Sequence, residues 1–442
     1  MHQHPVGSVC SAGLIVLLSA AGLSGQAAGI PPAPAPAAGD GPATVEDVRH
    51  ASGTSWQPDQ TPVRALQGAA GGWRFMLHGN VSLAYVKAQT RRGGARLGGV
   101  NWGMAHASRP IPGGTLTLTG GGSLETITMG ECGLPGLLGT GPVCPSHVKR
   151  EFQHPHPPLM ELAGRLEQRL SGPLRLEVYG ALAGEPALGP PTYLHRLSAA
   201  ADPIAPISHH ETSPAHASGG VLTAGVGSAR WKLEGSVFHG AAADPDRLLP
   251  EQGPLTSRAG RLSLNPAPAW SMQLSLGRIA GAPGHHSGAE GTIRSVTASA
   301  MHHHRRGASG VWATSLALAR MTDGTLPRRA ALLESSLSRG ETHTWFGRIE
   351  AADRVESRIT IIEHPDGSHE HLVDSRRLQV AQLAAGYLRG HRIRAASVGV
   401  GVRGSITFLP AGLRADDRVP RPVSFAVYAS VRPAASTEHH HE

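Results

Sequence analysis

The sequence predicts an all-β protein, a single antiparallel transmembrane β-barrel of about 16 strands within a range of 14 to 18. The first observation is alternation: along 231–237, the apolar residues Trp231, Leu233 and Val237 are separated by polar ones. A period of two puts the apolar side chains on one face of a strand. The second is repetition, because many such segments of about 10 residues, joined by turn residues, are typical of bacterial outer-membrane barrels.

Composition is the third observation. Only 16% of the 442 residues are charged, whereas soluble domains carry about 25%. No apolar run after the first 30 residues is long enough for a membrane-spanning helix, and 57 Gly and 35 Pro favour turns over long helices. The 4% aromatic content and the non-aromatic C-terminus are unusual for an outer-membrane barrel, so a soluble β-solenoid or periplasmic sandwich stays open as an alternative.

In chain order, four regions are expected. Residues 1–28 read as a signal peptide with a short apolar core, and 29–70 as a disordered leader rich in Pro, Ala and Gly. Residues 71–433 form the barrel and 434–442 a His-rich tail. The strand candidates are 72–89, 97–108, 114–128, 158–169, 173–183, 218–228, 230–240, 256–265, 269–279, 292–303, 310–321, 329–339, 342–352, 376–389, 392–408 and 422–432.

Long connections interrupt this series. Residues 130–157 contain Cys132 and Cys144, for which an oxidising compartment permits a disulfide. Residues 184–217 are rich in Pro and His, and 353–375 read as an exposed polar loop. Loops this long are uncommon unless they are functional.

The formal net charge of +8 comes from scattered arginines without a basic cluster. This pattern argues against nucleic acid as a partner and favours contact with outer-membrane lipid, or a lumen for small charged solutes. The sequence does not define an oligomeric state.

Histidine is abundant, with 26 residues, and concentrated in two of the long connections. Imidazoles and carboxylates there are the ligands that copper and zinc use where thiolates are scarce. The alternative is that these histidines are ordinary polar residues of loops and lumen. The candidate metal ligands are His154, His156, Glu161, Glu185, His195, His209, His210 and His216.

Several motifs around these histidines resemble a family of uncharacterised bacterial outer-membrane β-barrel-type proteins. The family pattern contains N-W-x-M-x-M-A-S-R-P, Q-H-P-H-D, G-E-P-A-L-G-P followed by H-R-P-S-A, and S-H-H-x-x-D-S-T-H-I. This chain matches it at 101–110, 153–156, 184–190, 195–199 and 208–216. The resemblance implies an outer-membrane barrel and points to the handling of heavy metals such as copper.

This chain departs from the pattern at two positions. Pro157 and Ser213 stand where the family has Asp, so two carboxylates that could bind metal or orient histidines are missing. Glu211 is a possible substitute.

Three functions follow as hypotheses: a pore or metal-binding envelope protein, a surface scaffold without a ligand, and a hydrolase built on Ser208 with His209 or Ser213 with His216. We expect no enzyme, because no motif for an activated serine is present.

Overall fold

The computed structural model describes residues 49–89, 94–130, 133–136, 152–153, 155–240, 247–283, 290–307, 310–322, 326–363, 369–411 and 421–435. All of them belong to one compact unit, 39–442. The expected signal peptide, the two cysteines and the tail from 436 lie outside the described residues. No helix in the described ranges is long and apolar enough to span a membrane.

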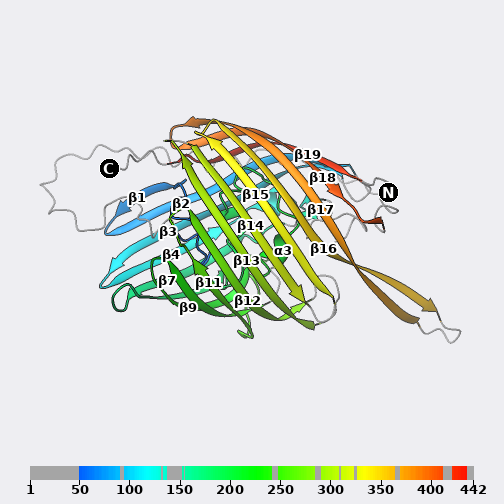
Figure 1. Ribbon diagram of the computed structural model, residues 1–442, viewed down its shortest axis with the longest axis horizontal. Helices are drawn as coiled ribbons and strands as arrows, with labels where there is room; N and C mark the ends of the chain where they lie inside the picture. Colours follow the sequence, from blue (N-terminus) through cyan, green and yellow to red (C-terminus); the bar gives the residue numbers. More distant parts are fainter. Residues whose placement is uncertain are drawn as a thin grey trace, which may run out of the picture. The chain divides into compact units, whose positions relative to one another are not determined.

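The wall of this unit is a closed antiparallel barrel (Figure 1). Its main sheet has 17 strands in the described part of the chain. One of them, β1 (Leu66–Ala70), only extends the start of β2, and the other 16 form the ring. They are β2 (Trp73–Ala88), β3 (Ala95–Ile111), β4 (Gly114–Gly122), β7 (Leu159–Arg169), β8 (Arg175–Gly184), β9 (Ser218–Gly227), β10 (Trp231–His239), β11 (Ser257–Leu264), β12 (Trp270–Pro283), β13 (Glu290–Arg306), β14 (Gly310–Thr322), β15 (Pro327–Arg339), β16 (His343–Glu363), β17 (His369–Ile393), β18 (Ala396–Phe408) and β19 (Val423–Pro433).

Each wall strand pairs with the next one along the chain, and the ring closes where β19 pairs with β2 from Ser424↔Ala88 to Val431↔Val81. The predicted fold class is therefore confirmed, and the soluble alternatives are excluded by the closure together with an apolar exterior.

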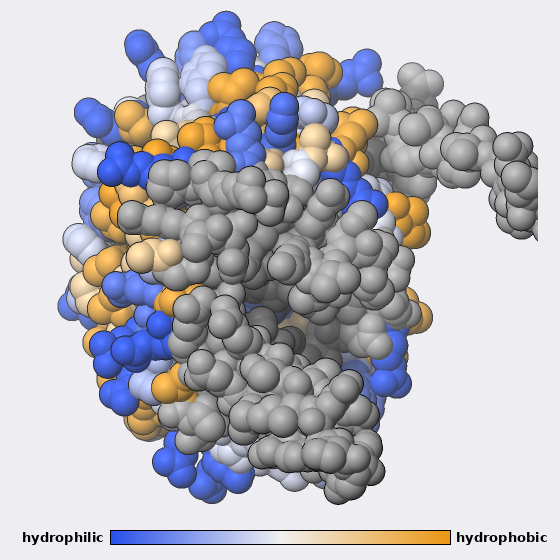
Figure 2. Space-filling view, turned by 90° about the vertical axis from the view of Figure 1, so that its right-hand side faces the viewer, coloured by the Kyte–Doolittle hydropathy of each residue, from blue (hydrophilic) through white to orange (hydrophobic). Residues whose placement is uncertain are grey.

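The side chains of the wall are distributed as in a membrane protein. On β10, Leu233 is 56% exposed and Trp231 38%, whereas their neighbours Lys232 and Glu234 are buried. The same alternation recurs around the ring, and hydrophobic side chains are visible around the wall in Figure 2. Apolar residues face outward and polar residues face inward, the reverse of a soluble barrel.

Two strand predictions need correction. The expected polar loop 353–375 is mostly strand, because β16 runs on to Glu363 and β17 begins at His369. The run Ile359–Ile362 is rich in β-branched residues, which favour strands. The predicted strand 114–128 ends early at Gly122 and is followed by the short helix α2 (Glu125–Thr128).

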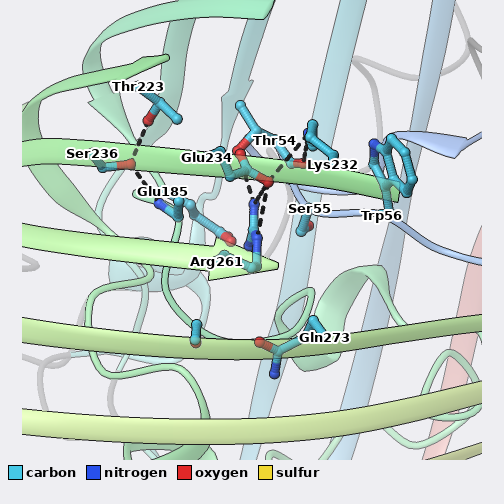
Figure 3. Close-up of polar contacts among 12 residues, drawn as sticks. Thr54, Ser55, Trp56, Glu185, Thr223, Lys232, Glu234, Ser236, Arg261 and Gln273 are labelled. Atoms are coloured by element: carbon cyan, nitrogen blue, oxygen red, sulfur yellow. Dashed lines mark hydrogen bonds and ion pairs between the residues drawn. The ribbon is translucent and has the colours of Figure 1, made fainter. Parts of the chain in front are cut away.

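The lumen contains an N-terminal segment, defined here as residues 49–64. Thr54 donates to Glu234, and its own hydroxyl and carbonyl accept from Arg261 at 2.8 Å and Lys232 at 2.7 Å (Figure 3). Trp56 lies beneath the guanidinium of Arg49, 4.9 Å from the ring centroid. The prediction of a disordered leader over 29–70 is therefore wrong for 49–70, because 49–64 contact the wall and Leu66–Ala70 is strand β1, whereas 29–48 lie outside the described residues.

We expect the free-energy cost of a charged residue on the outward face to depend on how deep that residue lies in the membrane. Leu276, 57% exposed at the middle of β12, becomes costly as Leu276→Arg, by about 2–4 kcal/mol of unfolding free energy in a bilayer. The matched Leu264→Arg, at the end of β11, costs only about 0–1 kcal/mol. Denaturant titration of the protein in phospholipid vesicles measures both, and equal losses would contradict a membrane-embedded wall.

Candidate functional site

The connection between β8 and β9, residues 185–217, folds into the barrel and is called here the lumen loop. Charged pairs join it to the wall. Arg196 lies 2.6 Å from Glu334 on β15, and Asp202 accepts from Arg403 on β18 at 3.0 Å. All four side chains are buried, and breaking such a pair would leave an uncompensated charge. These buried ion pairs therefore fix the lumen loop to the wall of the barrel.

Three histidines converge at this loop and form what we call the three-histidine site. His156 precedes β7, His209 begins the short helix α3 (His209–Thr212), and His216 precedes β9. One ligand nitrogen from each lies within 4.8 Å of the other two. His156 and His209 are buried and His216 is half-buried. The sequence could not place His156 beside residues more than fifty positions away.

Hydrogen bonds orient two of these rings. The Nδ1 of His156 donates to the buried carboxylate of Glu125 at 2.7 Å, and the Nδ1 of His216 donates to the carbonyl of Ser213 at 2.8 Å. A carboxylate and a carbonyl only accept, so each ring carries a proton on Nδ1, and Nε2 is the nitrogen left to bind a metal ion. This is the usual arrangement around metal-bound histidines, in which an outer group fixes the tautomer.

The spacing also suits a metal ion. The Nε2 atoms of His209 and His216 are 3.3 Å apart. With Zn–N bonds of about 2.0–2.1 Å, two ligands of a tetrahedral zinc ion are about 3.3 Å apart. Three neutral imidazoles would leave a fourth position for water or another ligand, as in open zinc sites.

Glu125 was not predicted from the sequence. It begins α2 and takes the position near His156 that the Asp replaced by Pro157 was expected to fill, accepting also from the backbone N–H of His156 at 2.9 Å. Ser213 contributes its carbonyl instead of a carboxylate. Glu211 does not substitute, because it faces Arg354 at 3.2 Å. Nothing in the local sequence marks Glu125, which lies 31 residues before His156.

The other predicted ligands are divided among different places. His210 lies beside the three-histidine site, with its ring centroid 5.1 Å from that of His209. His154 is outside the described residues. His195 belongs to a separate group with His78 and Trp102. Each of these assignments as a ligand stays a prediction.

Glu161 and Glu185 hold the N-terminal segment. Glu185 accepts from the hydroxyl of Ser52 at 2.8 Å, and Glu161 accepts from Tyr179 at 3.0 Å and from the backbone of Gly53. Burial, and next the neighbouring Glu161 carboxylate, raises the pKa of Glu185 to about 8. A carboxyl that keeps its proton near neutral pH is a poor metal ligand.

A further group of possible ligands consists of His50, Glu167 and Glu177. Here a cation is already present, because the ammonium of Lys232 lies 2.9 Å from Glu177. His50 itself lies 3.2 Å from Glu167. Burial lowers the pKa of His50, which favours its neutral form. The group therefore works as an ion-pair network that anchors the N-terminal segment.

The hydrolase hypothesis gains no support from the serine contacts. Ser208 donates its hydroxyl to Glu350 at 2.9 Å, and Ser213 meets His216 through its backbone carbonyl. A nucleophilic serine would need its hydroxyl bonded to a histidine base.

No protein-family model matches this chain, and no curated protein matches it in sequence. Similar solved structures include an anion-selective porin from Comamonas acidovorans, with 10% identity over 82% of this chain and 99% of that one and a TM-score of 0.47. OmpF of Salmonella typhi, in complex with daunomycin, has 10% identity over 83% and 100% and a TM-score of 0.45. OmpT of Vibrio cholerae has 6% identity over 83% and 100% and a TM-score of 0.44. The barrel assignment rests on the strand pairing of this chain, and no argument about activity follows from these values.

We expect Glu185 to make stability depend on pH. Its folded pKa of about 8 exceeds the ordinary 4.5, so the folded state holds an extra proton between these values. Stability is therefore fully present below about pH 4.5 and is lost as pH rises toward 8. In Glu185→Gln, the loss between pH 5 and pH 8 becomes about 1–3 kcal/mol smaller.

Urea unfolding in detergent at pH 5, 6.5 and 8 measures this difference. Glu251→Gln is the control, because Glu251 is exposed and pairs only loosely with Arg247 at 3.9 Å. An unchanged pH dependence in Glu185→Gln would show that this carboxyl is ionised in the folded protein.

Proposed function

We propose that the protein is a bacterial outer-membrane β-barrel that binds a divalent transition metal, copper or zinc, inside its lumen. The observation that carries this proposal is the convergence of His156, His209 and His216 with two of the three rings oriented by Nδ1 hydrogen bonds. The apolar exterior of the wall supports the membrane location, with lipid as the surrounding partner. No catalytic step and no nucleic acid form part of the proposal.

The donor set favours particular metals. Imidazole nitrogens suit zinc and copper, whereas magnesium and calcium prefer oxygen ligands. The site is formed by the lumen loop and by His156 before β7, so an ion bound there would lie inside the barrel rather than on its surface. This position favours the uptake or retention of metal ions over a role as an open pore, because the lumen loop and the N-terminal segment occupy the interior.

The first test is metal content. The mature protein is extracted in detergent, ends before Glu438 so that the terminal His439–His441 are absent, and is dialysed against zinc or copper. We expect at least one equivalent by elemental mass spectrometry, with one equivalent lost in His209→Ala. His304→Ala, which removes an exposed histidine of β13, should keep the wild-type content. An unchanged metal content in His209→Ala would contradict the proposal.

We also expect the carboxylate of Glu125, which orients His156, to raise the affinity of the three-histidine site for zinc. Glu125→Gln keeps the size of the side chain but removes its charge, so the three-histidine site should bind zinc about 10- to 100-fold more weakly. Competition with a chromophoric chelator measures the dissociation constant, with Glu251→Gln as the control. An unchanged constant would mean that Glu125 serves the fold rather than the site.

A further inference from the structure

A second set of imidazoles lines the wall of the lumen. His78 on β2 and His106 on β3 are diagonal neighbours, because His78 pairs with Met104 and His106 with Met76. Their Nε2 atoms are 3.0 Å apart, and their rings are nearly parallel, at 22°. The two rings therefore meet through the nitrogens that metals bind.

The second nitrogen of His106 has its own partner. Nδ1 lies 3.1 Å from the hydroxyl of Thr119 on β4. This bond holds the ring in place and keeps Nε2 directed at His78. The 3.0 Å separation is slightly below the spacing of about 3.3 Å between two ligands of a tetrahedral zinc ion, so a small rotation of either ring would accommodate an ion.

A cavity of about 140 Å³ adjoins the His78 side of this pair. Its wall includes His78, Met76, Trp102 and His195, together with residues of the N-terminal segment. A metal held by only two imidazoles needs further ligands, and the cavity has room for water molecules to supply them. Two protein ligands and exchangeable water would make a weaker site than three histidines.

His195 lies beside His78. Its ring centroid is 6.0 Å from that of His78 and 4.5 Å from that of Trp102. His195 and His78 also line the same cavity, so a third imidazole of the kind that binds transition metals is next to the pair.

We propose that His78 and His106 form a second, weaker site for the same class of transition-metal ion, with His195 as a further imidazole beside it. The lumen then carries two metal sites. The second site is inferred from the geometry of His78 and His106 alone. The exchange of ions between the two sites rests on the proposed function.

Metal stoichiometry in variants tests this. The detergent-extracted protein ending before Glu438 is dialysed against zinc at increasing free concentration. We expect two equivalents in the wild type, with the weaker one lost in His106→Ala and in His78→Gln. His209→Ala should lose the tighter one, and His304→Ala should keep both. Heat-modifiable mobility in electrophoresis checks that each variant is a folded barrel.

Copper binding provides a second measurement, which would not change if these histidines had only a structural role. Pulsed electron paramagnetic resonance counts the imidazoles bound to Cu(II), and in His106→Ala we expect the remaining ion to show three rather than two. The two substitutions at different histidines keep the test decisive if one of them fails to fold.

The outcomes separate the two proposals. A single equivalent that is lost in His209→Ala and kept in His106→Ala overturns the second site and leaves the three-histidine site intact. A single equivalent that is lost in His106→Ala and kept in His209→Ala supports the site at His78 and His106 and overturns the proposed function. Two equivalents that survive both substitutions, or no bound metal in the wild type, would overturn both.

Discussion

The pairing of charge inside the lumen is the constraint on which the rest of this structure depends. A membrane barrel turns its polar faces inward, so arginines, glutamates and serines of the wall meet in a confined space where an unpaired charge is costly. Glu334 and Glu234 on the wall are each matched by a guanidinium, from Arg196 of the lumen loop and from Arg261 of β11. The lumen loop and the N-terminal segment supply further partners, as Asp202 does for Arg403 and Thr54 for Lys232, and these contacts hold both segments inside the barrel.

The same confinement decides the chemistry of the histidines. Desolvation disfavours an imidazolium, and His195 illustrates this with a pKa lowered to about 3. Several carboxylates of the lumen are paired with arginine or lysine, as Glu177 is with Lys232. At the three-histidine site the carboxylate of Glu125 instead accepts from the ring of His156 and orients it. A carboxylate that fixes the orientation of a ligating ring is the usual arrangement around metal-bound histidines.

The sequence predicted the wall well because alternation is a local signal: Trp231, Leu233 and Val237 alone indicate which face of their strand meets lipid. The grouping of the predicted ligands was not accessible in this way. His156 and His209 are brought together by loops that fold inward, whereas Glu161 and Glu185, close to them in sequence, contact the N-terminal segment instead. His78 and His106 escaped notice because each is a single polar residue on an alternating strand, and only the strand register makes them neighbours.

The supports of the three-histidine site do not involve a metal. The lumen loop is joined to the wall by Arg196–Glu334 and Asp202–Arg403, and the ring of His156 is fixed by Glu125. In small zinc-dependent domains the metal supplies the folding free energy, whereas here a barrel of 16 paired strands and several buried ion pairs supply it. A site that is already assembled spends less of its binding energy on ordering the chain. An ion could therefore be bound and released without unfolding the loop. This behaviour is expected of a site that exchanges its metal rather than of a structural metal centre.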